Sequence, residues 1–253
     1  MINAFYKKYQ KHFDVSENNF AHFVMWSCGG ICIGFVIGLV GIAFHLALEW
    51  ATEFRTAHPM LLWLLPFGGL AIVLAYRLAG QEKDRGTNFI LVAVRANEAV
   101  TLRTAPLIFF STVVTHLLGG SAGREGAALQ LGGSIASSFG RIFQLNEREG
   151  RIMTMCGMAA GFAALFGTPL TSVIFAMEVI TVGVMHYSAI VPCIISALVA
   201  AGLSQAVGIA PTTFSIAHIP ATVGLENCFR AAVLGVLCAV LSVLFCIVME
   251  HVG

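Results

Sequence analysis

The stretch GGSAGREGAALQLGG at residues 119–133 decides the fold. It places one carboxylate, Glu125, inside a glycine-rich break between two apolar segments. Residues 104–123 on one side and 126–140 on the other contain no Asp, Glu, Lys or Arg. An ionisable residue within apolar sequence of this length is a functional-site hypothesis, because a charge is costly to place at membrane depth.

The composition is that of a polytopic membrane protein. Of the 253 residues, 58% are hydrophobic and 11% are charged, and the mean hydropathy is +0.86. Such a chain is too apolar for a soluble domain and too long for a single membrane anchor. The formal net charge of +1 offers no concentrated basic face, so no nucleic-acid partner is expected. The seven cysteines show no metal-like spacing, so we interpret them as packing residues and expect neither metal nor cofactor.

The first apolar run covers residues 23–48. It is longer than the roughly 20 residues that cross a hydrocarbon core, so the helix should be tilted. Lysines at positions 7, 8 and 11 precede it, which predicts a cytoplasmic N-terminus. Gly30, Gly34 and Gly38 recur at every fourth position, and this stripe predicts the close approach of another helix.

The segments that follow are unequal and broken. Residues 86–96 are too few to span a membrane and are interpreted as a partial or re-entrant helix, which needs protein or water around its exposed backbone. Asn146 and Glu149 predict a capping pair for a helix over residues 147–166. Repeated Gly and Pro interruptions are typical of channels and transporters whose helix ends converge near the midplane. The other predicted segments are 60–76, 101–118, 127–143, 170–180, 187–207 and a last helix from about residue 225.

The glycine break itself predicts an anion site. A helix beginning at Gly126 would leave the amides of Gly126, Ala127 and Ala128 without internal acceptors, and its dipole would add roughly half a positive charge there. Such a helix end binds anions. When ionised, Glu125 would compete with a permeant anion for this position, and when protonated it would lose its attraction to the amides. One residue could thus act as both gate and proton carrier.

Three other interpretations of the break are open. Arg124 and Glu125 could form a buried ion pair that merely closes a turn. A nucleotide-binding loop is disfavoured because the Gly-Lys-Ser/Thr ending is missing. Catalysis has little support because Ser121 has no base beside it and His116, in an apolar run, is interpreted as a packing residue. We therefore predict that the protein is not an enzyme.

Four runs of residues resemble one known family. GSAGREG at 120–126, LQLGG at 129–133, the MAAGFAALFGTPL run at 158–170 and FAME at 175–178 are similar, in order, to motifs of the CLC chloride channels and proton-coupled anion transporters. The resemblance implies an all-α polytopic membrane protein with the broken and tilted helices of the CLC fold. It further implies that the chain holds the first inverted repeat plus the first helix of the second.

The resemblance also implies site residues. Glu125 corresponds to the family's external gating and proton-transferring glutamate. Residues 86–90 lie where the family has Gly-Ser-Gly-Ile-Pro, with Thr87, Asn88 and Ile90 replacing Ser, the second Gly and Pro. The implied anion-binding residues are Gly86, Thr87, Asn88, Phe89, Ile90, Gly123, Arg124, Gly126 and Ala127.

With these departures the chain looks most like the family's bacterial fluoride-exporting branch, in which the selectivity serine is replaced and the internal glutamate is absent. Val179 falls where chloride/proton antiporters keep an internal proton-transfer glutamate. A small, strongly hydrated anion needs dense hydrogen-bond donors, which the Thr87 hydroxyl and Asn88 amide can supply, and the edge of the Phe89 ring carries partial positive charge. The function expected is proton-coupled fluoride export. A chloride-selective CLC channel or transporter and a non-transporting, truncated fragment are the alternatives.

The same resemblance sets expectations for organisation and partners. The expected parts are a cytoplasmic segment at 1–19, a first membrane repeat at 20–224 and the first helix of an incomplete second repeat at 225–253. The family's Gly-x-Phe-x-Pro motif and second-half tyrosine do not occur in this sequence, so this chain alone would hold half an anion site. Expected partners are fluoride or chloride, protons, the lipid bilayer and a second copy through residues 170–207, in a bacterial inner (plasma) membrane.

Overall fold

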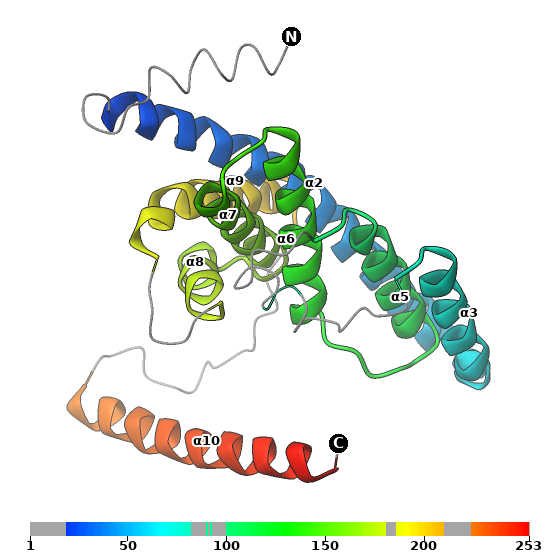
Figure 1. Cartoon of the computed structure of the whole chain (residues 1–253). Helices are drawn as coiled ribbons and strands as arrows, with labels where there is room; N and C mark the ends of the chain where they lie inside the picture. The colour runs from blue at the N-terminus through cyan, green and yellow to red at the C-terminus, as the bar shows by residue number, and fades with distance from the viewer. Residues whose placement is uncertain are drawn as a thin grey trace. The chain divides into compact units, whose positions relative to one another are not determined.

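The computed structural model describes residues 19–81, 90, 92, 100–180, 186–209 and 224–252 (Figure 1). These residues form helices and contain no strand, so the predicted all-α class is confirmed. The chain divides into two units, Met1–Thr212 and Thr213–Gly253. The predicted boundaries at 20 and 225 stay a prediction. The elements are α2 (Asn19–Ala57), η1 (Pro59–Leu64), α3 (Leu65–Leu78), α5 (Thr104–Leu117), α6 (Glu125–Ile142), α7 (Glu147–Phe166), α8 (Pro169–Glu178), η2 (Tyr187–Ala189), α9 (Ile190–Ala206) and α10 (Leu225–Val252).

Four helical stretches in the described part are long and apolar enough to cross a membrane: Phe23–Ala57, Pro59–Leu78, Tyr187–Ala206 and Leu225–His251. The chain is therefore a multi-pass membrane protein. α2 has 39 residues, which corresponds to about 58 Å at 1.5 Å per residue. The predicted span over 23–48 was too short, because the polar residues after Leu48 continue the same helix.

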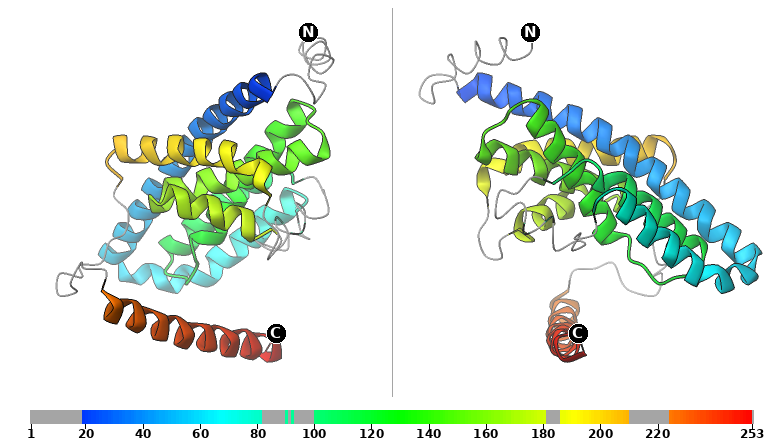
Figure 2. Two further views of the ribbon diagram at one scale, coloured as in Figure 1. Left: turned by 90° about the vertical axis from the view of Figure 1, so that its left-hand side faces the viewer. Right: turned by 45° about the vertical axis from the view of Figure 1, so that its right-hand side comes forward.

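α2 and α9 cross closely (Figure 2), and the predicted glycine stripe makes this possible. A Cβ atom on Gly34 would overlap the backbone of Ser196, and one on Gly38 would lie 3.1 Å from the Cα atom of Ala200. Gly30 faces the same helix one turn earlier. The prediction that this stripe admits another helix backbone is confirmed, and it fixes the position of α2 beside the core.

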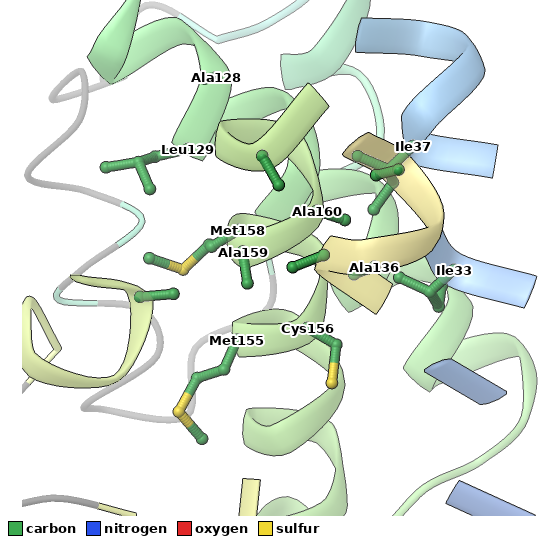
Figure 3. Packing of buried hydrophobic residues seen from close by; sticks show 14 of the residues in the cluster. Ile33, Ile37, Ala128, Leu129, Ala136, Met155, Cys156, Met158, Ala159 and Ala160 are labelled. Atoms are coloured by element: carbon green, nitrogen blue, oxygen red, sulfur yellow. The ribbon is translucent and has the colours of Figure 1, made fainter. Parts of the chain in front are cut away.

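α7 is the centre of the first unit and packs against α2, α6, α8 and α9. Its side chains from Ile152 to Leu165 are almost all buried. Figure 3 shows the small and flexible side chains of this core. α7 itself contributes the small Ala159 and Ala160 and the flexible Met155 and Met158, all of them buried. Small side chains bring the helix axes close, so dispersion contacts stabilise this core although the surrounding lipid is equally apolar.

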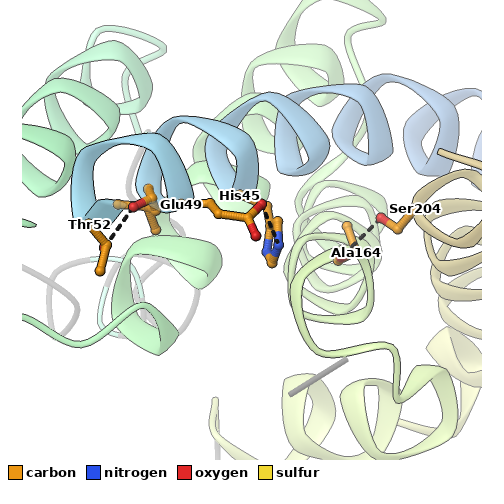
Figure 4. A network of polar contacts seen from close by, with 6 residues as sticks. His45, Glu49, Thr52, Ala164 and Ser204 are labelled. Atoms are coloured by element: carbon orange, nitrogen blue, oxygen red, sulfur yellow. Dashed lines mark hydrogen bonds and ion pairs between the residues drawn. The ribbon is translucent and has the colours of Figure 1, made fainter. Parts of the chain in front are cut away.

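Two buried hydroxyl groups join α9 to α7. Ser196 Oγ donates to the Cys156 carbonyl oxygen at 3.0 Å, and Ser204 Oγ donates to the Ala164 carbonyl oxygen at 2.8 Å (Figure 4). Each bond gives a buried hydroxyl an acceptor and fixes the register of the two helices. All seven cysteines are free thiols.

The ends of α7 agree with the sequence prediction. The Asn146 side chain accepts from the Glu149 amide at 3.0 Å, and the Glu149 carboxylate accepts from the Asn146 amide at 3.1 Å. This capping box starts the helix at Glu147. Gly167, with φ +66°, ends it in a left-handed conformation. α8 then begins at Pro169, whose missing amide hydrogen has no cost at a helix start.

Asn146→Ala is expected to lower the free energy of unfolding by about 1 kcal/mol, because it removes the side-chain acceptor of the Glu149 amide. Thermal unfolding in detergent measures the change. Asn146→Asp keeps the acceptor and is the matched control. Equal midpoints for Asn146→Ala and Asn146→Asp would contradict a stabilising role of the cap.

Candidate anion site at the start of α6

The break before α6 begins with a tight helix ending. Gly119 has φ +82°, a conformation that favours glycine because it has no Cβ. The amide of Gly120 donates to the carbonyl oxygen of Thr115 at 2.8 Å, which is the long bond of a Schellman ending. α5 therefore stops at Leu117, and residues 120–123 connect it to α6 without regular structure.

α6 begins one residue before Gly126, the assumed helix start, and two residues before the predicted segment 127–143. Its first residue is Glu125, and Arg124 at the N-cap already has helical angles of φ −86° and ψ −20°. The amide of Ala128 consequently donates to the Arg124 carbonyl oxygen at 2.9 Å, so its predicted availability for an anion was wrong. The amides without a helical acceptor are those of the first turn, at Glu125, Gly126 and Ala127.

The Glu125 side chain folds back toward the start of its own helix. A Cβ atom placed on Gly123 would lie 2.6 Å from Glu125 Oε2. The carboxylate thus occupies the space that a side chain at position 123 would need. This position lies at the end of α6 where the helix dipole is positive, which stabilises an ionised carboxylate. The Glu125 side chain is also exposed.

Arg124 lines a polar pocket of about 450 Å³ between α2, α5 and the start of α6. No ion pair within 4.0 Å joins Arg124 to Glu125 among the described residues. The alternative that these two residues simply close a turn as an ion pair therefore finds no support in the geometry. The pocket lining consists of His45, Leu48, Glu49, Thr52, Glu53, His116 and Arg124.

Sequence reasoning missed this pocket. The predicted first apolar run ended at Leu48, whereas α2 continues to Ala57. The available signal was the spacing of His45, Glu49 and Glu53, which at four-residue intervals lie on one helix face. His116, interpreted as a packing residue, lines the same pocket and binds the Thr112 carbonyl oxygen through Nδ1 at 2.8 Å.

Of the predicted anion-binding residues 86–90, the structure describes only Ile90. Gly86, Thr87, Asn88 and Phe89 lie outside the described residues. Ile90 is helical and only 2% exposed.

Ile90 packs on the surface of α6, where a Cβ on Gly133 would overlap the Ile90 Cδ1 atom. Gly133 follows Glu125 by two turns, about 12 Å along the helix axis. The structure therefore brings Ile90 to α6 but away from the carboxylate of Glu125.

The end of α8 carries the position that the family resemblance matches to an internal glutamate. Val179 is the C-cap of α8, and its amide donates to the Phe175 carbonyl oxygen at 2.9 Å. Glu178, the last residue of the helix, is exposed. The position matched to an internal glutamate therefore carries an apolar side chain.

Broken helices around a buried crossing, with a protonatable carboxylate at an unsatisfied helix start, define a polytopic membrane protein of the channel and transporter class. The sequence profile described as "Voltage gated chloride channel" matches residues 67–253. The chain belongs to this family, as the motif resemblance predicted.

Two curated relatives and a solved structure support this family assignment. A "Chloride/fluoride channel protein" from Pseudomonas syringae pv. tomato is 36% identical over 222 residues, which is 87% of this chain and 49% of the relative. An "H(+)/Cl(-) exchange transporter ClcA" from Cronobacter sakazakii is 34% identical over 160 residues, covering 57% of this chain and 34% of that protein.

The crystal structure of a CLC-type fluoride/proton antiporter superposes with a TM-score of 0.74 at 33% identity, covering 83% of this chain and 52% of that one. The predicted CLC fold is thereby confirmed. The chain spans about half the length of the Pseudomonas relative and of the antiporter.

Proposed function

We propose that this chain takes part in transmembrane anion transport, as proton-coupled fluoride export with Glu125 as the protonatable gate. The observation that carries the proposal is the position of the Glu125 carboxylate, folded back over Gly123 at the start of α6. The similarity to a solved fluoride/proton antiporter at 33% identity supports it.

The proposed gating follows from the charge of one side chain. Ionised Glu125 is stabilised by the helix dipole and by first-turn amides that have no helical acceptor, and in that state it excludes an anion. A proton that binds the carboxylate removes its charge and most of this attraction. The side chain then leaves, and a fluoride ion takes its place near Gly126 and Ala127. The carboxyl group then releases its proton, and the ionised carboxylate returns and displaces the fluoride.

The proposed anion contacts come from two segments. Gly123, Arg124, Gly126 and Ala127 surround the start of α6. The second set is assigned from the sequence alone and comprises Gly86, Thr87, Asn88, Phe89 and Ile90. Of these, Ile90 packs against Gly133 and would contribute only from the periphery of the site. The donors at Thr87 and Asn88 suit an ion whose tightly held water must be replaced.

Chloride is the second candidate substrate. The name of the Pseudomonas relative includes both anions, and that of the Cronobacter relative specifies proton and chloride exchange. The apolar side chain of Val179, at the position matched to the internal glutamate, favours fluoride over ordinary chloride/proton exchange.

The proposed assembly and orientation rest on exposed apolar side chains and on the lysines near the N-terminus. Exposed apolar side chains on α8 and α9, such as Ile174 and Leu198, offer a surface for a second copy through residues 170–207. Lysines 7, 8 and 11 favour a cytoplasmic N-terminus in a bacterial inner membrane.

Ion efflux from proteoliposomes that contain the purified 253-residue chain tests the proposal. Fluoride and chloride electrodes compare the two rates at equal gradients. If the chain transports by itself, fluoride efflux should exceed chloride efflux at least about tenfold, and faster chloride efflux would favour chloride as the substrate. Efflux of neither ion above that of protein-free liposomes would favour the third possibility, a non-transporting fragment.

Gly123→Ala is expected to displace the Glu125 carboxylate, because the new Cβ would lie 2.6 Å from Oε2. Loss of a charge-assisted contact worth about 1.5 kcal/mol should raise the ratio of open to closed gate roughly tenfold. Fluoride efflux at alkaline pH, where the wild-type gate is closed, should rise by about that factor. An unchanged alkaline rate in a folded Gly123→Ala variant would contradict this position of the gate.

A further inference from the structure

The polar pocket beside α6 concentrates titratable groups within a membrane-spanning helix. α2 contributes His45, Glu49 and Glu53, α5 contributes His116, and Arg124 completes the pocket one residue before the gate. None of these side chains on α2 or α5 has a role in the anion site described above. A polar cluster of this kind inside a transmembrane segment indicates a pathway for ions or protons.

His45 and Glu49 form a graded pair within the pocket. His45 Nε2 lies 3.9 Å from Glu49 Oε2 (Figure 4). The side chain of Glu49 is 58% exposed, whereas that of His45 is 14% exposed. The pair thus extends from an accessible carboxylate to a nearly buried imidazole, one helical turn deeper.

The second ring nitrogen of His45 is buried and has no hydrogen-bond partner. A buried polar atom without a hydrogen-bond partner costs free energy, because it loses its hydration. If position 45 only filled space between helices, an apolar side chain would avoid this cost. Nε2 is the ring nitrogen that lies 3.9 Å from Glu49 Oε2, so this atom is the candidate for proton exchange.

The charge of the pocket selects protons over anions. Glu49 and Glu53 oppose the single guanidinium of Arg124, so the lining is net negative while both histidines are neutral. His116 keeps one ring nitrogen bonded to its own helix. No group of three His, Cys, Asp or Glu in the described part of the chain is arranged to hold a metal ion. A fluoride or chloride ion is repelled from this lining, and a proton is attracted.

We propose that His45 and Glu49 form a proton-holding pair that loads Glu125. This rests on the proposed function, in which Glu125 carries the proton. A hydronium ion gives its proton to Nε2 of His45 and leaves as water, and the Glu49 carboxylate stabilises the imidazolium. The Nε2–H bond then breaks, and the proton passes through water in the pocket to the Glu125 carboxylate, leaving both His45 and Glu125 neutral. Arg124 repels the bound proton and so prevents its permanent retention.

Histidine-ring NMR of the full 253-residue chain in lipid nanodiscs tests the pair without any need for transport. The His45 resonance, assigned by its loss in His45→Gln, is followed over about pH 5 to 9 in the wild type, Glu49→Gln and Glu125→Gln. Glu147→Gln, an exposed change at the start of α7, is the control. The His45 midpoint is expected to move by about 0.5 pH unit or more in Glu49→Gln and Glu125→Gln, and to stay in place in Glu147→Gln. If His45→Gln fails to fold, Gln variants of the other seven histidines assign the signal by exclusion; these are His12, His22, His58, His116, His186, His218 and His251.

A His45 resonance that does not titrate, or whose midpoint is the same in Glu125→Gln as in the wild type, would overturn the proposal. Exchange assays separate this failure from failure of the proposed function. If the wild type exchanges fluoride for protons, Glu49→Gln should slow exchange several-fold near neutral pH and recover at acid pH, and an unchanged rate would also overturn the proposal. If the wild type shows no exchange while the His45 midpoint depends on Glu125, the proposed function fails and the coupled proton pair stands.

Discussion

Glu125→Gln is expected to abolish proton movement coupled to fluoride while the chain stays folded. Glutamine has nearly the same shape as protonated glutamate, but it cannot bind and release a proton, so the exchange cycle cannot close. Proton flux measured with a pH electrode under a fluoride gradient should fall to the level of protein-free liposomes. Fluoride movement should then be absent or independent of pH.

Glu147→Gln is the matched control for this prediction. Glu147 is an exposed glutamate at the start of another helix of the same unit, so it shares the helix position of Glu125 but not its place at the break. Its variant should keep wild-type coupling. Coupled proton flux of wild-type size in Glu125→Gln would remove Glu125 from the transport cycle.

Gly157→Ala is expected to have the largest effect on stability, because it separates α6 from α7 at the centre of the core. A Cβ on Gly157 would overlap the carbonyl oxygen of Gly132 and the Cβ of Ala136. Neither can move as a flexible side chain end would. Overpacking in a well-packed core costs about 1 to 3 kcal/mol of folding free energy. A loss at the upper end of this range is expected here, because the new Cβ meets backbone atoms. The thermal unfolding midpoint in detergent measures the loss.

Gly202→Ala tests the same substitution without the contact. Gly202 lies within α9, and a Cβ there would meet nothing within 4 Å. Alanine favours helix by up to about 1 kcal/mol over glycine, so this variant should be as stable as the wild type or more stable. Similar losses at Gly157 and Gly202 would show that the crossing of α6 and α7 does not depend on its glycines.

The sequence predicted α7 within its observed bounds because both ends have local signals. Asn146 and Glu149 start the helix and Gly167 ends it, and each acts within one turn of its own position. α2 was predicted too short for the opposite reason. Its polar residues after Leu48 face a pocket built with α5 and α6, and no local pattern shows which distant segments will cover a polar face.

The candidate site was predicted in part. The motif located Glu125 and predicted the start of α6 to within two residues. The error arose because Arg124 adopts helical angles, which places the Ala128 amide inside the helix. The fold-back of the carboxylate over Gly123 and the pairing of His45 with Glu49 depend on side-chain contacts that sequence spacing alone does not determine.

A pH gradient imposed on proteoliposomes that contain the 253-residue chain tests the central claim most directly. With equal fluoride on both sides and the outside made acid, proton entry through a Glu125-gated exchanger should drive fluoride out against the gradient that develops, as recorded by an external fluoride electrode. Chloride in place of fluoride should show little movement. Fluoride that does not move when the pH gradient is imposed would contradict proton-coupled fluoride export by this chain.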